Sequence, residues 1–290
     1  MTPLFARVTV AGVGLVGGSL AVAARAAGLV GEVIGYGRGE ANLRLARERG
    51  LVDRVAREPA AAVAGADLIV LAVPVGASTA LAEVFRPHAR PGAILTDVGS
   101  VKAGVVEALE ARWPDRRLVV GAHPIAGSEL SGAGAARVDL FRGRRCIVTP
   151  TAVTDREALA RVRALWEGVG AVVDEMPAAL HDEILARVSH LPHLAAYALV
   201  SAFGETRIAG RRVLDYAGSG YRDTTRIAAS RPELWRDIAL ANRAALRGAL
   251  AEFRAALDRL ESLVVAGDGD ALEAALATAA VLRRRLGGER

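Results

Sequence analysis

The residues best suited to chemistry lie in one stretch, residues 121–132, which reads GAHPIAGSELSG. It sets His123 beside a proline and a run of small residues, and glycine lets a backbone approach a ligand closely. The apolar run at residues 118–120 predicts a buried strand, so we expect His123 just past its carboxyl end. Ligands bind at that edge of an open α/β sheet. For the loop taken alone, a hydrogen-bonded surface histidine in a turn is the simpler explanation.

A glycine-rich stretch at residues 10–20 reads VAGVGLVGGSL and has the spacing G-x-G-x-x-G between a strand and an alanine-rich helix. In this pattern the first glycine makes a tight turn, the second admits a pyrophosphate, and the third lets helix and strand pack closely. The helix N-terminus then faces the phosphates with free N–H groups. This context favours a dinucleotide site over a turn without a ligand. We predict cofactor contacts at Gly12, Gly14, Leu15, Val16 and Gly17.

The end of the second strand bears on the choice of cofactor. An acidic residue there commonly binds the ribose 2′-hydroxyl of NAD. This chain has Gly37, which leaves space, and Arg38, whose charged fork of donors suits a 2′-phosphate. We therefore expect NADP to be accepted, with NAD as the alternative and strict specificity left open. Arg38 stacked on adenine, or facing solvent, is the other interpretation.

Two further strand ends reach the same predicted edge. Residues 97–102 read DVGSVK and open a helix, which places Ser100 and the only lysine of the chain, Lys102, near the ligand. Ser100 as a plain helix N-cap would explain its position, but capping does not exclude a ligand contact. Val73 and Pro74, which close the strand at residues 66–74, are also predicted to contact the cofactor.

These stretches belong to an alternating series of strands and helices. Strands are expected at residues 7–11, 32–36, 66–74, 93–97, 118–120, 144–150 and 171–176, with helices at 20–27, 40–50, 79–85 and 155–168. The alternation predicts an α/β fold, an N-terminal Rossmann-type doubly wound parallel sheet in residues 1–176. Beyond it, an apolar helix at 184–203 and an a/d stripe at 246–264 predict an all-α dimerisation domain in residues 177–290.

The helical part contains two motifs. Residues 189–193 read SHLPH, with two histidines beside a helix-kinking proline. We discount a zinc site, because no cysteine or third ligand lies nearby in the sequence. Residues 218–227 place Arg222 and Arg226 after a glycine-rich turn, and arginine grips carboxylates through two hydrogen bonds. A pair of Arg222 with Asp223 at the next helix is an equal explanation for Arg222.

Composition narrows the possible partners. The net charge is +5, but the arginines are scattered and only 4% of the 290 residues are aromatic, so no nucleic-acid groove is expected. The single cysteine, Cys146, excludes an internal disulfide framework and should be a buried thiol. The uncharged run at residues 8–24 is rich in glycine rather than signal-like, and no other run could span a bilayer. We expect a cytoplasmic protein without a membrane partner.

Together these motifs resemble the prephenate and arogenate dehydrogenases of tyrosine biosynthesis. The resemblance covers nearly the whole chain and includes GYRDTTRIA at residues 220–228, with all five motifs in the family's order. It implies NAD(P)-dependent oxidative decarboxylation of prephenate to 4-hydroxyphenylpyruvate, or of arogenate to tyrosine, by a homodimer joined through the helical domain. The chain ends soon after that domain, so we expect no regulatory domain or fused mutase.

The resemblance also implies roles for single residues. His123 would accept the hydroxyl hydrogen as the catalytic base, and Ser100 would bind the same hydroxyl or orient His123. Arg226 matches the arginine that binds the substrate carboxylate, and His193 matches a histidine on the substrate side. Lys102 would lie next to the cofactor. No metal is expected.

The loop after His123 supplies two more candidates, Ser128 and Glu129, which we expect on the substrate side. Prephenate and arogenate differ in carrying a keto acid or an amino acid. The charge of Glu129 should attract the ammonium group of arogenate and so influence the choice between them. A solvated loop glutamate is the alternative.

Two other functions stay open. A 3-hydroxyacid dehydrogenase or an imine-reductase-like enzyme also joins a Rossmann domain to a helical dimer domain, but should not combine the HPIAG loop with SHLPH. A dinucleotide-binding sensor without catalysis is the non-enzyme alternative. Intact His123, Ser100 and Arg226 argue against the sensor.

Overall fold

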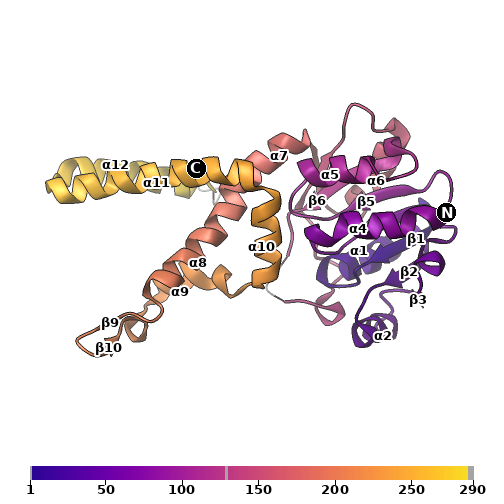
Figure 1. Ribbon diagram of the computed structural model, residues 1–290, viewed down its shortest axis with the longest axis horizontal. Coiled ribbons are helices and arrows are strands. Elements are labelled where there is room, and N and C mark those ends of the chain that lie inside the picture. Colours follow the sequence, from indigo (N-terminus) through magenta and orange to yellow (C-terminus); the bar gives the residue numbers. More distant parts are fainter. Residues whose placement is uncertain (1, 128–129, 287–290) are drawn as a thin grey trace. The chain divides into compact units, whose positions relative to one another are not determined.

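The computed structural model describes residues 2–127 and 130–286. It divides into two compact units, Met1–Asn242 and Arg243–Arg290. The first unit contains a large sheet and most of the helices (Figure 1). In this unit α7 (Ala178–Leu185) and α10 (Pro232–Ala241) pack against α5 (Ala103–Glu110) and α4 (Val75–Phe85) respectively. The domain boundary between residues 176 and 177 therefore stays a prediction.

The sheet has eight strands in the order β3-β2-β1-β4-β5-β6-β7-β8. Their bounds are β1 Phe5–Ala11, β2 Val30–Tyr36, β3 Arg54–Ala56, β4 Leu68–Leu71, β5 Ile94–Asp97, β6 Val119–Pro124, β7 Arg145–Thr149 and β8 Val172–Glu175. The first six are parallel, which confirms the predicted Rossmann-type fold. β7 runs antiparallel to β6, and β8 runs parallel to β7. If β7 were parallel to β6, the chain between them would need a long crossover, usually a helix. The described residues of 125–144 form no α-helix, which fits the antiparallel direction of β7.

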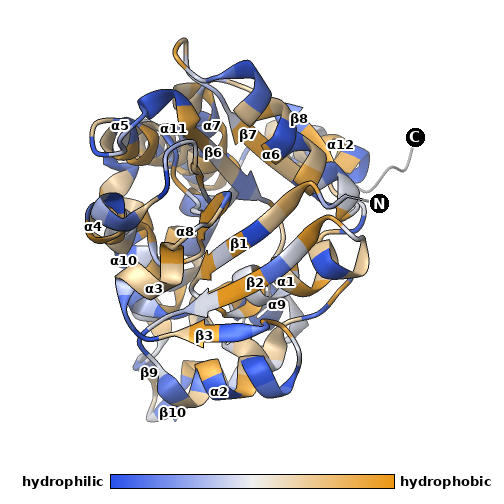
Figure 2. Cartoon of the chain, turned by 90° about the vertical axis from the view of Figure 1, so that its right-hand side faces the viewer, coloured by the Kyte–Doolittle hydropathy of each residue, from blue (hydrophilic) through white to orange (hydrophobic). Residues whose placement is uncertain are grey.

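Helices cover both faces of the sheet because strand residues alternate between two cores. Val70 faces one core and Ile69 the other, as the two-residue period of a strand requires. On the first face lie α1 (Leu15–Ala26), α2 (Glu40–Glu48) and α6 (Arg156–Gly168); on the second lie α3 (Pro59–Val63), α4 and α5. Figure 2 shows the apolar stretches along the strands between these layers. Cys146 belongs to the first core, where burial raises the pKa of its thiol.

Most predicted elements are present, with shifted ends, but one shift matters for the site. His123 lies inside β6, paired opposite Ile147, and not past the end of that strand as predicted. β6 extends to Pro124 because β7 hydrogen-bonds along residues 121–124, a pairing that the apolar run 118–120 does not reveal. The short elements β3 and α3 were not predicted.

The helix predicted at residues 184–203 is a continuous run of α7, a π-helical turn at Ala186–His190, and α8 (Leu191–Phe203). Pro192 stands in the first turn of α8. Proline has no N–H, and its ring clashes with the carbonyl four residues earlier, so the chain widens before it. The predicted kink is therefore a π-helical turn that contains Ser189 and His190.

The rest of the helical part is short elements followed by two long helices. A hairpin of β9 (Arg207–Ile208) and β10 (Arg211–Arg212) leads to α9 (Ser219–Thr225) and α10. The second unit contains α11 (Arg243–Ala266), which bears the predicted a/d stripe, and α12 (Gly269–Leu286), which packs against it. Within the described ranges, none of the helices is long and apolar enough to cross a membrane.

Candidate active site

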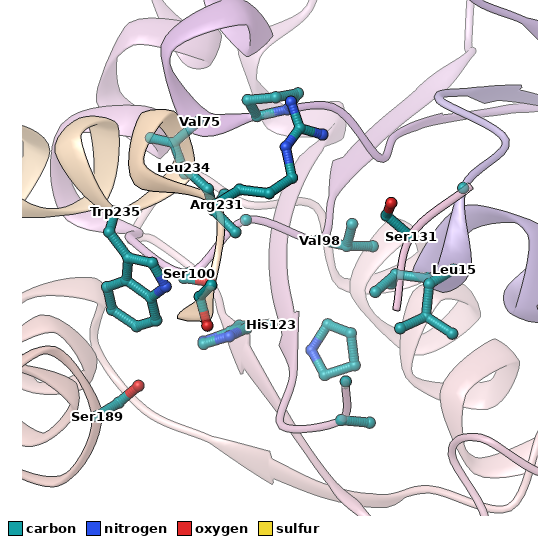
Figure 3. A pocket seen from close by; sticks show the side chains of 18 of the residues that line it. Leu15, Val75, Val98, Ser100, His123, Ser131, Ser189, Arg231, Leu234 and Trp235 are labelled. Atoms are coloured by element: carbon teal, nitrogen blue, oxygen red, sulfur yellow. The ribbon is translucent and has the colours of Figure 1, made fainter. Parts of the chain in front are cut away.

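A cavity of about 750 Å³ lies at the carboxyl edge of the parallel strands in the first unit. Its sheet side is formed by residues 14–17, 72–75, 98–100 and 123–127. Its helical side is formed by residues from the π-helical turn, from α8 and from the segment 226–235. Figure 3 shows Trp235, Ser100 and His123 on one side and Val98 and Leu15 on the other. The volume suits a small-molecule site.

The glycine loop has the geometry that a dinucleotide needs. Gly12 has φ +96°, and a Cβ there would lie 2.1 Å from the carbonyl oxygen of Ala72. A Cβ on Gly17 would lie 2.3 Å from the carbonyl oxygen of Gly12. A Cβ on Gly14 would meet nothing within 4 Å, and no side chain caps the N-terminus of α1. Gly12 and Gly17 thus close the turn, while Gly14 leaves the helix N–H groups open to a phosphate.

The predicted cofactor residues fall into two groups. Gly14, Leu15, Val16, Gly17, Val73 and Pro74 line the cavity. Gly12 and Arg38 do not line it, and Arg38 is exposed at the end of β2. A Cβ on Gly37 would meet only a methyl group of Leu43, at 3.7 Å, so the end of β2 has room for a larger group.

Lys102 does not line the cavity either. Its side chain is fully buried, forms an ion pair with Asp97, and donates to the carbonyl of Ala122 at 2.9 Å. Asp97 also accepts from the N–H of Ala122, at 3.3 Å. The geometry therefore does not support the predicted cofactor contact of Lys102. A buried ammonium needs a charged partner, and Asp97 is that partner. The pair hydrogen-bonds the backbone of Ala122, the residue that precedes His123.

His123 is the first of three buried side chains that are linked by hydrogen bonds, followed by His181 and Asp182. Its Nδ1 lies 2.8 Å from Nε2 of His181, and Nδ1 of His181 lies 2.8 Å from a carboxylate oxygen of Asp182. Burial, together with the nearby His181, Lys102 and His190, places the pKa of His123 well below its usual value. A neutral imidazole at neutral pH is what a catalytic base requires.

Sequence reasoning did not identify His181 and Asp182. The only signal was an adjacent His-Asp pair shortly after the predicted domain boundary, 58 residues from His123. Nothing local links that pair to the loop of residues 121–132. Only the packing of α7 against the sheet domain brings it to His123.

The two histidines of SHLPH lie in different environments. His193 lines the cavity, lies 3.0 Å through Nδ1 from the carbonyl of Ser189, and stacks on Trp235 with ring centroids 3.4 Å apart. Burial lowers the pKa of His193. His190 is buried outside the cavity lining, with Nδ1 3.0 Å from Nδ2 of Asn242, and burial lowers its pKa to about 4. Trp235 was not predicted.

Further polar groups at the cavity are Ser100 and two arginines of the segment 226–231. Ser100 is half-buried in the lining and lies beside His123 in Figure 3. Arg226 and Arg231 line the cavity and are exposed. Arg222 does not line it and donates to the carbonyl of Ala217 at 3.2 Å. Ser128 and Glu129 lie outside the described residues, so their predicted roles stay predictions.

Two protein-family models match this chain. The nucleotide-binding domain of prephenate dehydrogenase matches residues 20–175, and the dimerization domain of prephenate dehydrogenase matches residues 177–278. Cyclohexadienyl dehydrogenase of Zymomonas mobilis is 37% identical over 270 residues, which are 93% of this chain and 92% of that protein. Prephenate dehydrogenase of Bacillus subtilis is 33% identical over 266 residues, which are 91% of this chain and 72% of that protein.

Solved structures agree with these matches. The structure of prephenate dehydrogenase from A. aeolicus in complex with hydroxyphenyl propionate and NAD⁺ has a TM-score of 0.92 and 34% identity, covering 97% of this chain and 98% of that one. Synechocystis arogenate dehydrogenase has a TM-score of 0.83 and 32% identity, covering 97% and 99%. With both family models matched and relatives similar over nearly its whole length, this chain belongs to the prephenate dehydrogenase family.

Proposed function

We propose that this chain catalyses the NAD(P)-dependent oxidative decarboxylation of prephenate, of arogenate, or of both, in tyrosine biosynthesis. One observation carries the proposal: a buried histidine, His123, whose pKa is held below its usual value by burial, lines the same cavity as the glycine loop and Arg226. The names of the relatives, which include prephenate, cyclohexadienyl and arogenate dehydrogenases, support this reaction. No observation favours a 3-hydroxyacid dehydrogenase or a sensor without catalysis.

The residues of the site would divide the chemistry as follows. A bound nicotinamide supplies the acceptor for the hydride that leaves the carbon bearing the ring hydroxyl. His123 accepts the hydroxyl proton as the carbonyl forms, and Ser100 hydrogen-bonds the same oxygen. Arg226 binds a substrate carboxylate and sets the ring against the cofactor side. His193, fixed by Ser189 and Trp235, lines the substrate side. Loss of carbon dioxide then leaves an aromatic ring.

We propose that NADP is accepted and that Arg38 binds its 2′-phosphate. The room at Gly37 and the exposed position of Arg38 at the end of β2 support this assignment. The end of the second strand is where Rossmann folds distinguish NAD from NADP. An arginine there is complementary to a phosphate dianion.

We further propose a homodimer joined through a helical domain of residues 177–290. The match of residues 177–278 to a dimerization domain supports it. Apolar side chains exposed within the second unit also support it: Leu257, Val264, Val265, Leu276 and Leu282. Light scattering coupled to gel filtration should give the mass of two chains, and the mass of one chain would contradict the proposal.

A steady-state assay that crosses two substrates with two cofactors tests the function. NAD(P)H absorbance should rise with prephenate or arogenate. Release of carbon dioxide should match the NAD(P)H formed, one for one. No turnover in any of the four combinations, by protein that binds NAD(P)H, would reject the proposed reaction.

A further inference from the structure

Asp182 is an acceptor held in a fixed position. One of its carboxylate oxygens accepts from the backbone N–H of Lys102 at 2.7 Å, and the other accepts from the N–H of Ala103 at 2.8 Å. These are N–H groups at the start of α5, whose N-terminus favours a negative charge. Asn242 fixes the same residue by donating to the backbone carbonyl of Asp182 at 2.7 Å. An ionised carboxylate can only accept hydrogen bonds.

The direction of the next two hydrogen bonds follows from that acceptor. Nδ1 of His181 lies 2.8 Å from Asp182, so this nitrogen must carry the proton and donate it. In a neutral imidazole the other nitrogen is then an acceptor. Nε2 of His181 lies 2.8 Å from Nδ1 of His123, which must in turn be the donor. The remaining nitrogen of His123, Nε2, is left without a proton.

Burial prevents other groups from reversing this order. His181 is fully buried and Asp182 is 5% exposed, so bulk water cannot replace either partner. A histidine proton sits on the nitrogen whose hydrogen bond the surroundings dictate. The carboxylate at the start of α5 thus determines, through two rings, which nitrogen of His123 is protonated.

We propose that His181 and Asp182 are positioning residues that hold His123 in the tautomer with a proton on Nδ1, leaving Nε2 as the base. Only the catalytic role of Nε2 rests on the proposed function. The tautomer itself is a property of the protein without substrate. It can therefore be measured separately from activity.

The decisive measurement is ¹⁵N NMR of the histidine rings in the full chain. The protein has five histidines, and the His123 signals are those lost in His123→Asn. We expect Nδ1 of His123 to be protonated and Nε2 to be unprotonated near pH 7. A proton on Nε2, which would follow if His181 carried protons on both nitrogens, overturns the proposal whatever the kinetics.

Two variants that differ by one methylene test the consequence for catalysis. His181→Gln places an amide near the position of Nε2, where its oxygen can still accept from His123. His181→Asn places the amide near Nδ1, where it reaches Asp182 but not His123. We expect His181→Asn to lower kcat by about 10- to 100-fold with KM unchanged, as loss of an orienting partner does. It should also give His123 a mixture of tautomers. His181→Gln should retain more activity and one tautomer.

The matched control is Asp53→Asn. Asp53 also accepts a backbone N–H, that of Val33 at 2.7 Å, and an arginine, Arg25, but lies outside the cavity lining. Its kcat should not change. Equal kcat losses in His181→Gln and His181→Asn, with the His123 tautomer unchanged in both, would overturn the positioning role. Failure of wild type to use prephenate or arogenate would reject the function and leave the tautomer result standing.

Discussion

The two sides of the cavity are built in different ways. The cofactor side is backbone from one continuous stretch, residues 12–17, in which glycines make the turn and expose N–H groups. The catalytic side is made of side chains from separate segments, since His123, His181 and Asp182 come from β6 and α7. A backbone site depends on the absence of side chains, whereas a side-chain site depends on long-range packing. The two sides should therefore respond differently to substitution.

The largest effect should come from the catalytic side. We expect His123→Asn to lower kcat by about 10²- to 10⁴-fold, because the general base is removed. Fluorescence titration with NADPH should give an unchanged Kd, since the glycine loop is intact. His88→Asn, which alters an exposed histidine outside the cavity lining, is the control. Turnover of His123→Asn near the wild-type rate would contradict the base assignment.

Arg226→Ala should have the next largest effect. Losing a charged hydrogen bond to the substrate carboxylate should weaken binding by about 1.5–3 kcal/mol, visible as a higher KM. The matched control is Arg222→Ala, because Arg222 is also exposed but contacts Ala217 and does not line the cavity. Equal changes in KM for the two variants would count against the assignment.

Two glycine substitutions separate folding from binding on the cofactor side. Gly17→Ala should lower the free energy of unfolding by about 1–3 kcal/mol, because its Cβ would overlap the backbone of Gly12. Gly14→Ala adds the same methyl group where nothing lies within 4 Å, so it should keep stability and weaken NADPH binding. Urea unfolding and NADPH titration of both variants measure these effects. A loss of stability in Gly14→Ala, or weaker NADPH binding by a stable Gly17→Ala, would contradict the two roles.

The pH dependence sharpens the account of the catalytic side. His123 must be neutral to accept a proton, so activity falls as pH decreases through its pKa. Because burial lowers that pKa, kcat/KM should stay level at neutral pH and decline only below the usual range of histidine. A profile of kcat/KM against pH with a saturating cofactor measures this. A midpoint at the ordinary histidine pKa would mean that His123 is more hydrated than its 8% exposure suggests.

The smallest and most selective effect concerns the cofactor. Gly37→Asp should lower kcat/KM with NADP and shift preference toward NAD, because a carboxylate repels a 2′-phosphate and accepts from a 2′-hydroxyl. Gly39→Asp adds the same charge two residues later and serves as the control. Strong preference of the wild type for NAD, or a preference unmoved by Gly37→Asp, would reject the role of Arg38.

The sequence by itself determined the elements whose causes are local. Short apolar runs predicted the strands, and the glycine spacing at residues 12–17 predicted the tight turn at Gly12, where φ is +96°. Val73, Pro74 and Ser100, which we expected at the ligand edge of the sheet, all line the cavity, because strand ends in a parallel sheet share one edge. Each of these predictions needs only neighbouring residues and the rules of the fold.

Only the tertiary structure decided which partners meet. It turned β7 antiparallel, so that β6 extends through His123, and it buried Lys102 against Asp97 instead of exposing it to the cavity. It also brought the His181–Asp182 pair from α7 to His123. The physical reason is that a buried polar group takes its partner from whatever packing places within hydrogen-bond distance. A contact between His123 and His181, which are 58 positions apart, leaves no local pattern in the sequence.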